Sequence, residues 1–526
     1  MDINTIIAKL ELMVNSDSPN ATKELPTLVL ELAKYVKALT STKLYVRPAG
    51  TIYGSNNGTD YENAWSGFTN IDWTKVQGNI LVICGTHLES LKVESSDVEI
   101  IGNAIEESGK IDGENMRNIG VLIPSKNDIV ISDLEITRAL VSNLSIEGSS
   151  LNFISNNIIV SFSNNQGIQH LDSVSAIHNN PTCTNNTDDG ISAHDSAIFV
   201  VNKGTIVNNS EGIAHVGKTQ CTLNGPITFN NNSTSDWTCR SENNNLANAV
   251  DFLGDIYVDS PTVTEGVSCV INNCITFNDI NVLNGHTVEI NSSIVTNILY
   301  GRGGGIVNVN SSNINDFNLN GIDRELNLVD TFVRKGILSN VVKGTLTANR
   351  CVFDGVNQTK HMIDGVSGSN LSLIYTSFIN IPTAKYAVVS RVGIVSFKCD
   401  NNTFVGLNNV GKALFIKGTQ TANNCIFVNL DKVDNAEGMT YNNCCFYNNA
   451  SSPNGIVNNS QTNNPNLLNP TAFDFSLGTG SSCIRTGKTL TSNNIISMVN
   501  WGNQIEPPVI VTSKQPALWY IGANTD

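Results

Sequence analysis

The densest group of side chains suited to acid–base chemistry lies between residues 167 and 215. This stretch contains His170, Asp188, Asp189, His194, Asp195, Glu211 and His215. Two carboxyl groups placed together can hydrolyse a glycosidic bond, one as the general acid and the other as the base or the nucleophile. A histidine beside them could shuttle a proton or bind a sugar hydroxyl.

We therefore predict a carbohydrate site in this stretch. The predicted catalytic residues are Asp188, Asp189, His194 and Glu211, and the predicted substrate-binding residues are His170, Asp195, His215, Trp237 and Arg240. Three interpretations stay open: cleavage of a glycan, glycan binding without cleavage, and ordinary turn chemistry, because Asp before Gly is common at turns. Neither a metal nor another cofactor is predicted, since the chain has no Cys-x-x-Cys zinc pattern and no Asp-x-Asp array.

The imidazoles differ in their spacing from the nearest preceding glycine. His170 and His215 come three residues after Gly167 and Gly212, whereas His194 comes four residues after Gly190. We interpret the extra residue as a bulge, so that all three imidazoles would share one flank with the acids. Trp237 and Arg240 fall in a polar stretch, 230–248, which is expected to leave the repeat as a loop. There the indole would either stack on a sugar ring or plug the base of the loop.

A repeat positions these residues. A glycine followed by an apolar residue recurs at Gly120, Gly167, Gly190 and Gly212, and Asn143 fills the one gap, so that the intervals are 23, 24, 23 and 22 residues. Short strand-like segments separated by Asn-Asn pairs, as at 272–273, 401–402, 423–424 and 442–443, recur along the chain. Asn tolerates the left-handed backbone region, so these pairs predict sharp corners between strands. A unit of this length predicts a β-solenoid of roughly 15 to 19 coils over residues 43–480, in which stacked asparagines could form amide ladders.

Composition narrows the class of protein. Asparagine accounts for 76 of the 526 residues, only 15% are charged, and the net charge is −15. This acidic balance disfavours binding to nucleic acid. No apolar run is long enough for membrane insertion, and the first residues carry no secretory segment. The twelve cysteines are expected to be buried free thiols rather than a disulfide framework.

Residues 1–42 have a different, helical spacing. Apolar residues recur every three or four positions at Ile3, Ile6, Leu10 and Met13, and again at Leu25, Leu28, Leu32, Tyr35 and Leu39. This pattern predicts two short amphipathic helices. They would either cap the solenoid or serve as an oligomerisation and attachment segment.

Three segments carry a resemblance to a known family. They are Tyr45–Gly50 with Asn63-Ala64-Trp65, Asn464–Pro470 with Phe473–Leu477, and Trp519–Ala523. They resemble the entry, the closing segment and the ending of the right-handed parallel β-helix (pectate-lyase-like) family, although Tyr520 and Arg485 stand where that family usually has acids. Together with the repeat, the resemblance implies an all-β fold, with a right-handed parallel β-helix at 43–480 and its closing segment at 481–526. The short α-helical segment predicted at 1–42 precedes them.

A helical segment ahead of a β-helix is similar to the arrangement in bacteriophage tailspikes and tail fibres. That resemblance implies a homotrimer in the virion tail, made in the host cytoplasm and attached to tail proteins through residues 1–42. It also implies binding, and in many such proteins cleavage, of a host surface polysaccharide by a hydrolase or lyase depolymerase. Two alternatives stay open: a free bacterial polysaccharide lyase or glycoside hydrolase, and a structural virion rod without a ligand.

Overall fold

The computed structural model describes residues 41–483, 497–500 and 509–512, except for gaps at 104–106, 260–267, 284–286, 303–304, 336, 357–358, 366–369, 391–394, 407, 435–437 and 473. The predicted helical segment therefore lies outside the described residues, apart from Ser41 and Thr42. Most of the predicted closing segment, including Arg485 and Tyr520, lies outside them too.

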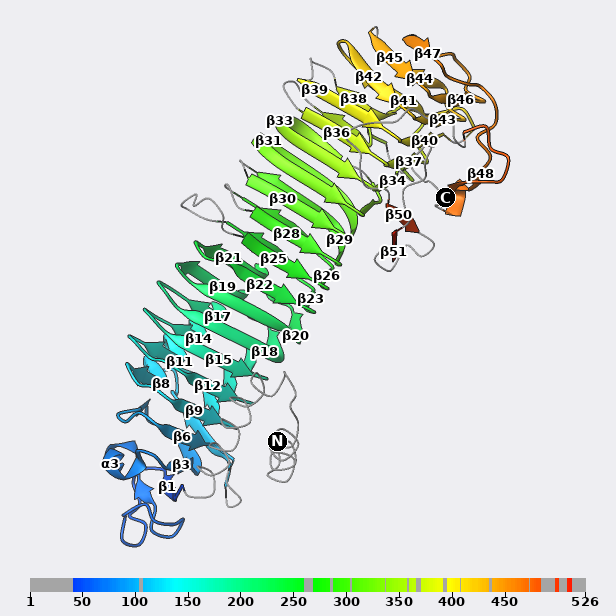
Figure 1. Ribbon diagram of the computed structural model, residues 1–526. Coiled ribbons are helices and arrows are strands. Elements are labelled where there is room, and N and C mark those ends of the chain that lie inside the picture. Colours follow the sequence, from blue (N-terminus) through cyan, green and yellow to red (C-terminus); the bar gives the residue numbers. More distant parts are fainter. Residues whose placement is uncertain are drawn as a thin grey trace, which may run out of the picture.

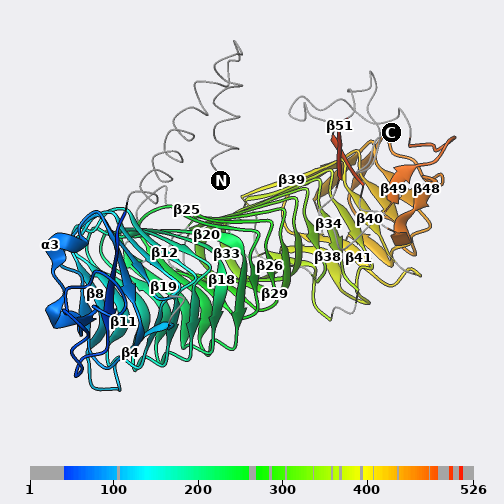
Figure 2. The same cartoon turned by 90° about the horizontal axis from the view of Figure 1, so that it is seen from below.

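The described chain winds into a parallel β-helix of about 15 turns (Figures 1 and 2), which confirms the all-β solenoid prediction. Each turn supplies one strand to each of three parallel sheets. Sheet 1 includes β1 (Lys43–Arg47), β3 (Ile80–Ile83), β6 (Val98–Ile101), β9 (Ile129–Ser132), β12 (Phe153–Asn156), β15 (Ser175–Asn179), β22 (Asn245–Asn248), β25 (Ser268–Asn272), β28 (Thr287–Asn291) and β30 (Gly305–Asn310). Sheet 2 includes β10 (Glu135–Thr137), β13 (Ile159–Ser161), β16 (Thr182–Thr184), β23 (Asp251–Phe252) and β26 (Ile275–Thr276).

Sheet 3 positions the candidate site. It includes β8 (Ile119–Pro124), β11 (Ser142–Glu147), β14 (Gln166–His170), β17 (Asp189–Ala193), β19 (Glu211–Gly217), β21 (Ser235–Ser241), β24 (Ile256–Val258) and β27 (Ile280–Val282). Five longer strands bend across corners and serve more than one sheet: β18 (Ile198–Val207), β20 (Gln220–Asn230), β29 (Ile294–Arg302), β31 (Asn313–Val329) and β33 (Ile337–Asn349). Outside the solenoid lie helix α3 (Trp73–Val76) and two antiparallel pairs, β48 (Leu467–Asn469) with β49 (Asp474–Leu477) and β50 (Ser497–Asn500) with β51 (Val509–Thr512).

The corner between sheets 1 and 2 depends on one residue with a left-handed backbone. Asn157, Asn180, Asn273, Asn424 and Asn443 occupy it in different coils, with φ between 50° and 53°. Asparagine adopts this region more readily than other residues with a side chain, so the predicted Asn-Asn corners are confirmed.

Stacked asparagines form the expected ladders. Asn179 Nδ2 donates to Asn156 Oδ1 at 2.9 Å, Asn202 Nδ2 to Asn179 Oδ1 at 2.9 Å, and Asn224 Nδ2 to Asn202 Oδ1 at 2.8 Å. Each amide thus donates to one coil and accepts from the next. These bonds satisfy half-buried polar groups without charge.

Small polar side chains line the inner side of the same corner. Ser293 Oγ donates to Asn291 O at 2.8 Å and Ser312 Oγ to Asn310 O at 2.8 Å, while Cys444 Sγ contacts Asn442 O at 3.4 Å. Cysteine here takes the place of serine, because its weakly polar thiol fits a position that is apolar on one side. All twelve cysteines are free and buried, as the sequence predicts.

The predicted repeat sets the strand register in the first half of the rod. Val121, Leu144, Ile168, Ile191 and Ile213 are register neighbours in successive coils of sheet 3. The glycines before them permit close packing: a Cβ on Gly190 would lie 2.7 Å from the carbonyl oxygen of Gly212. The repeat shortens farther along, where the bonded pair Asn291 and Asn272 is separated by 19 residues, so the predicted unit of 22–24 residues does not extend through the whole rod.

Asn157 tests the corner. We expect Asn157→Ala to be less stable than Asn157→Gly by roughly 0.5–1 kcal/mol, because both variants lose the amide but only alanine is strained at positive φ. Denaturant unfolding of the two variants measures the difference. Equal stability, or a more stable alanine variant, would show that the left-handed backbone does not govern this position.

Candidate functional site

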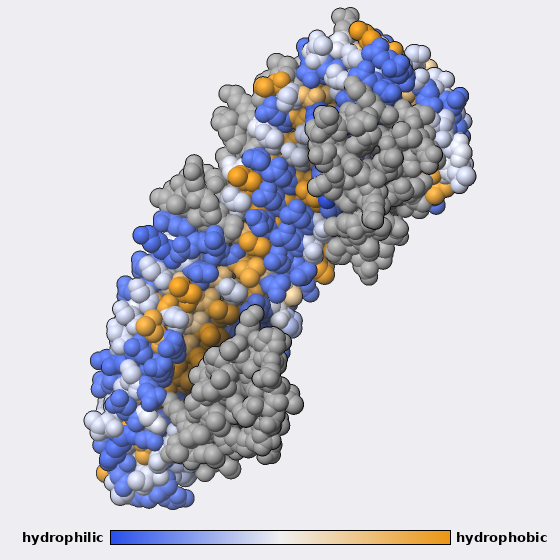
Figure 3. All heavy atoms as spheres, in the orientation of Figure 1, coloured by the Kyte–Doolittle hydropathy of each residue, from blue (hydrophilic) through white to orange (hydrophobic). Residues whose placement is uncertain are grey.

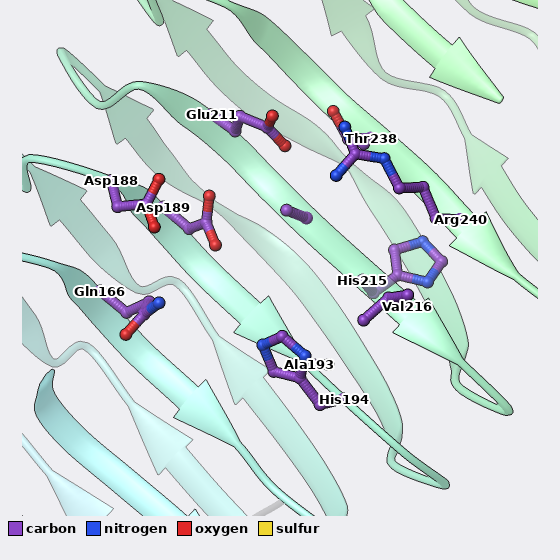
Figure 4. A pocket seen from close by; sticks show the side chains of 11 residues that line it. Gln166, Asp188, Asp189, Ala193, His194, Glu211, His215, Val216, Thr238 and Arg240 are labelled. Carbon is purple, nitrogen blue, oxygen red and sulfur yellow. The ribbon is translucent and has the colours of Figure 1, made fainter. Parts of the chain in front are cut away.

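The predicted acids meet on the outer side of sheet 3, at the start of its strands. Asp189 begins β17 and is the register neighbour of Glu211, which begins β19. Their Cα atoms are therefore one strand spacing apart, about 4.8 Å. Asp188 precedes Asp189, and Figure 4 shows all three carboxyl groups on the same side of the ribbon. The structure thus brings together three of the four predicted catalytic acids and bases.

A groove opens beside these acids. Its cavity volume is about 220 Å³, and its lining includes Gln166, Asp188, Asp189, His194, Glu211, His215, Thr238 and Arg240. Gln166 belongs to β14 and Arg240 to β21, so four adjacent coils contribute side chains. Figure 4 shows the three acids at the start of the strands and His194 toward their other end. The Arg240 guanidinium lies nearer to Glu211 than to His194.

Asp189 is the most strongly perturbed acid of this groove. Asp189 is only 8% exposed to solvent. The pKa of Asp189 is raised from 3.8 to about 8, first by burial and then by the negative charges of Asp188 and Glu211, against a smaller opposing effect of Arg240. Asp189 therefore carries a proton at neutral pH and can donate it.

Two buried polar atoms of the groove lining, and a third on the strand between them, have no hydrogen-bond partner. Within the described part of the chain, Gln166 Oε1, Ser192 Oγ and Glu211 Oε2 are buried and make no hydrogen bond. Buried polar groups in proteins are nearly always paired. A ligand rich in hydroxyl groups, such as a sugar, would supply partners to the Gln166 and Glu211 atoms, which line the groove.

The three predicted imidazoles do not share a face. His170, Ala193 and His215 are register neighbours, and both histidines are buried, at 0% and 2% exposure. His194 follows Ala193 by one residue, so its side chain points to the opposite face. The predicted bulge is therefore wrong: strand alternation turns His194 outward into the groove and the other two imidazoles into the core.

The buried imidazoles form hydrogen bonds within the core. His170 Nε2 lies 2.9 Å from His178 Nε2, and His178 Nδ1 lies 2.8 Å from Ser155 Oγ. Burial lowers the pKa of His170 to about 4, so this ring is neutral at physiological pH. His170 thus stabilises the interior and is not part of the groove lining, whereas His215, although only 2% exposed, also borders the groove.

Trp237 is also a core residue. The stretch 230–248 continues the solenoid through β21 and β22, so the predicted loop is wrong. Trp237 is 0% exposed, donates to His215 Nε2 at 3.1 Å and stacks on Phe252. Its polar, asparagine-rich neighbours are corner residues rather than a loop.

The other two predicted binding residues differ in their placement. Arg240, on the same strand as Trp237, is exposed and lines the groove. Asp195 lies at an exposed turn after β17, with φ 62°, and is not part of the groove lining.

The sequence did not identify two tyrosines in the outer row that continues from the groove. Ser192, Ala214, Thr238, Tyr257, Asn281 and Tyr300 are successive register neighbours. Tyr257 and Tyr300 are both partly exposed. Because two coil steps separate them, they are about 10 Å apart along the rod.

The described residues contain no group of three or more His, Cys, Asp and Glu side chains arranged to hold a metal ion. Among the same residues, no helix is long and apolar enough to cross a membrane. What the groove does offer is a proton-bearing carboxyl group, two neighbouring carboxyl groups, one guanidinium and several unpaired hydrogen-bonding atoms.

No protein-family model matches the chain, and no curated protein matches it.

The raised pKa of Asp189 predicts a pH dependence of stability. The unfolded chain ionises this group near pH 4, so between pH 4 and about 8 the folded protein holds a proton that the unfolded chain has lost. The free energy of unfolding therefore falls as pH rises through this window. We expect Asp189→Asn to lessen the fall and Asp195→Asn to leave it unchanged. Denaturant unfolding at several pH values measures it; identical slopes in the wild type and Asp189→Asn would contradict the assignment.

Proposed function

We propose that the chain binds a polysaccharide along the outer face of sheet 3 and hydrolyses it in the acidic groove. The observation that carries this proposal is the pair formed by Asp189 and Glu211 on adjacent coils. Asp189 holds a proton at neutral pH because its pKa is raised to about 8. A protonated and a negatively charged carboxyl side by side are the pair used in glycoside hydrolysis.

The groove residues take separate roles in this reaction. Asp189 donates its proton to the glycosidic oxygen as the bond from that oxygen to the anomeric carbon breaks. Glu211 acts on the anomeric carbon, either as the nucleophile or as the base that takes a proton from the attacking water. Thr238, Arg240 and His194 line the same groove and bind hydroxyl groups. Asp188 keeps the pKa of Asp189 high through its negative charge.

The charges of the groove indicate the class of glycan. With Asp189 protonated, the negative charges of Asp188 and Glu211 and the one guanidinium of Arg240 line it, so it disfavours a uronic-acid or sialic-acid polymer and accepts a neutral or amino-sugar polymer. This balance favours hydrolysis over β-elimination, since elimination requires a uronate and a base near it.

A polymer fits this face better than a small sugar. Thr238, Tyr257, Asn281 and Tyr300 extend the row beyond the acids, and aromatic rings offer apolar faces on which sugar rings stack. The chain of sugars would lie along the rod axis, with its scissile bond over Asp189 and Glu211.

The biological setting in this proposal is a phage tail. The parallel β-helix is compatible with a tailspike or tail fibre that attaches to host surface polysaccharide. Homotrimer assembly, the virion location and attachment to tail proteins through residues 1–42 belong to the same proposal, and they are supported by the resemblance and by the helical spacing of that segment.

Incubation with host capsule or lipopolysaccharide tests the hydrolysis. We expect new reducing ends without the ultraviolet absorbance of unsaturated uronates, and a rate that falls above pH 8 as Asp189, with its pKa of about 8, loses its proton. Asp189→Asn and Glu211→Gln should lower the rate by at least about 100-fold, in the range typical of general acid–base catalysis. Asp195→Asn, outside the groove, is the matched control.

Binding without cleavage is the competing outcome. Retained cell binding with no new reducing ends would sink the hydrolase and leave a glycan-binding rod. In that case Tyr300→Ala and Arg240→Ala should still weaken binding in a sedimentation assay. If neither variant weakens it, sheet 3 is not the glycan face.

A further inference from the structure

The outer face of sheet 1 carries an apolar row along one half of the rod. Successive register neighbours on this face are Val130, Ile154, Ile177, Val200, Thr222, Leu246 and Val270. Every side chain in the row except Thr222 is apolar. We call these seven residues the apolar row.

The row ends abruptly. The next register neighbours are Glu289, Asn308, Asn327 and Thr347, all polar. Figure 3 shows the same change, with an orange band over the strands around β12 to β22 and a mainly blue surface over β28 and β30. The fold of sheet 1 does not by itself require apolar side chains at this outward position, because the equivalent position is polar in the second half of the rod.

The apolar row retains solvent exposure. Ile177 is 38% exposed, and Ile198 beside it at the start of β18 is 50% exposed. The other apolar members are partly exposed. A contiguous apolar patch rimmed by polar residues is typical of a surface that a partner covers.

Residues 1–40 of the same chain fit this surface in pattern and position. Their apolar residues recur at helical spacing in two stretches, 3–13 and 25–39. The described chain starts at Ser41, directly before β1, which is the first strand of sheet 1. The segment therefore joins the rod at the edge of the sheet that carries the apolar row.

The lengths agree as well. The nine residue-to-residue steps from Leu32 to Ser41 span about 14 Å as a helix. Three coil steps lead from β1 to β9, which carries Val130, and they also span about 14 Å. Six further steps to Val270 put the end of the row about 43 Å from β1, within reach of the two predicted helices laid end to end, with the polar stretch 15–22 between them.

We propose that residues 1–40 pack lengthwise on the outer face of sheet 1, with their apolar side on the apolar row. The occupant is this segment of the same chain. A second copy of the rod offers only its own half-length row and leaves the segment's apolar residues without a partner. This packing is independent of the proposed hydrolase, since sheets 1 and 3 are different faces of the rod. Tail proteins would then contact only the polar side of this segment.

Disulfide trapping in the full-length chain tests the packing. The twelve native cysteines are buried, so a pair of introduced surface cysteines can be oxidised selectively. We expect Leu32→Cys with Val130→Cys to form an intrachain disulfide at least roughly tenfold faster than Leu32→Cys with Glu135→Cys, because docking raises the local concentration of the first pair of thiols. Glu135 is the matched control, because it lies in the same coil as Val130 but on β10 of sheet 2, at a similar distance along the rod.

Peptide mapping under non-reducing conditions separates the outcomes. Intrachain Leu32–Val130 linkage supports the proposal. Linkage between chains, or equal rates for the two pairs, would overturn it in favour of a second copy or an undocked segment.

A second variant removes the dependence on cysteine placement. Leu28→Asp with Leu32→Asp should uncover the apolar row and raise the binding of a hydrophobic fluorescent dye severalfold, while Lys34→Asp, off the apolar spacing, should not. No change in the double variant would show that residues 1–40 do not cover the row.

Discussion

Everything in this rod depends on turning the backbone sharply at the corners of each coil while keeping its polar groups paired. The left-handed corner residue makes the turn, and the stacked amides beside it satisfy one another, as in the chain of bonds from Asn224 to Asn202 to Asn179. Because neutral amides pair the polar groups at the corners, the rod needs few ion pairs there. That constraint explains a chain with 76 asparagines but only 15% charged residues.

The same constraint fixes the candidate site. Once the corners set the register, strand alternation decides which side chains enter the core and which face outward. Ala193 and His194 show the result, since the last residue of β17 points to the core and the residue after it points to the groove. Asp189 lies at the start of its strand, close enough to the corner to be buried and close enough to Glu211 to interact with it. Its raised pKa follows from that position, and the proposed acid chemistry follows from the raised pKa.

The sequence predicts the repeat and the corners because both depend on local backbone preference and on spacing that survives in the chain. It also predicts the acids at 188, 189 and 211, which lie at equivalent places in two adjacent coils of nearly equal length. It fails at His170 and Trp237, where polar or asparagine-rich surroundings suggested an exposed position although alternation put the side chain inside. The sequence does not predict that Tyr257 and Tyr300 share a row, because the coil length changes between them. Only the strand register shows it.

The measurement that tests the proposed site most directly is an NMR titration of the aspartate side-chain carboxyl carbons, with Asp189→Asn identifying the resonance. A carboxyl group that titrates near pH 8, and disappears in the variant, is the predicted result. If every aspartate titrates below about pH 5, as unperturbed groups do, then Asp189 carries no proton at neutral pH and cannot act as the acid.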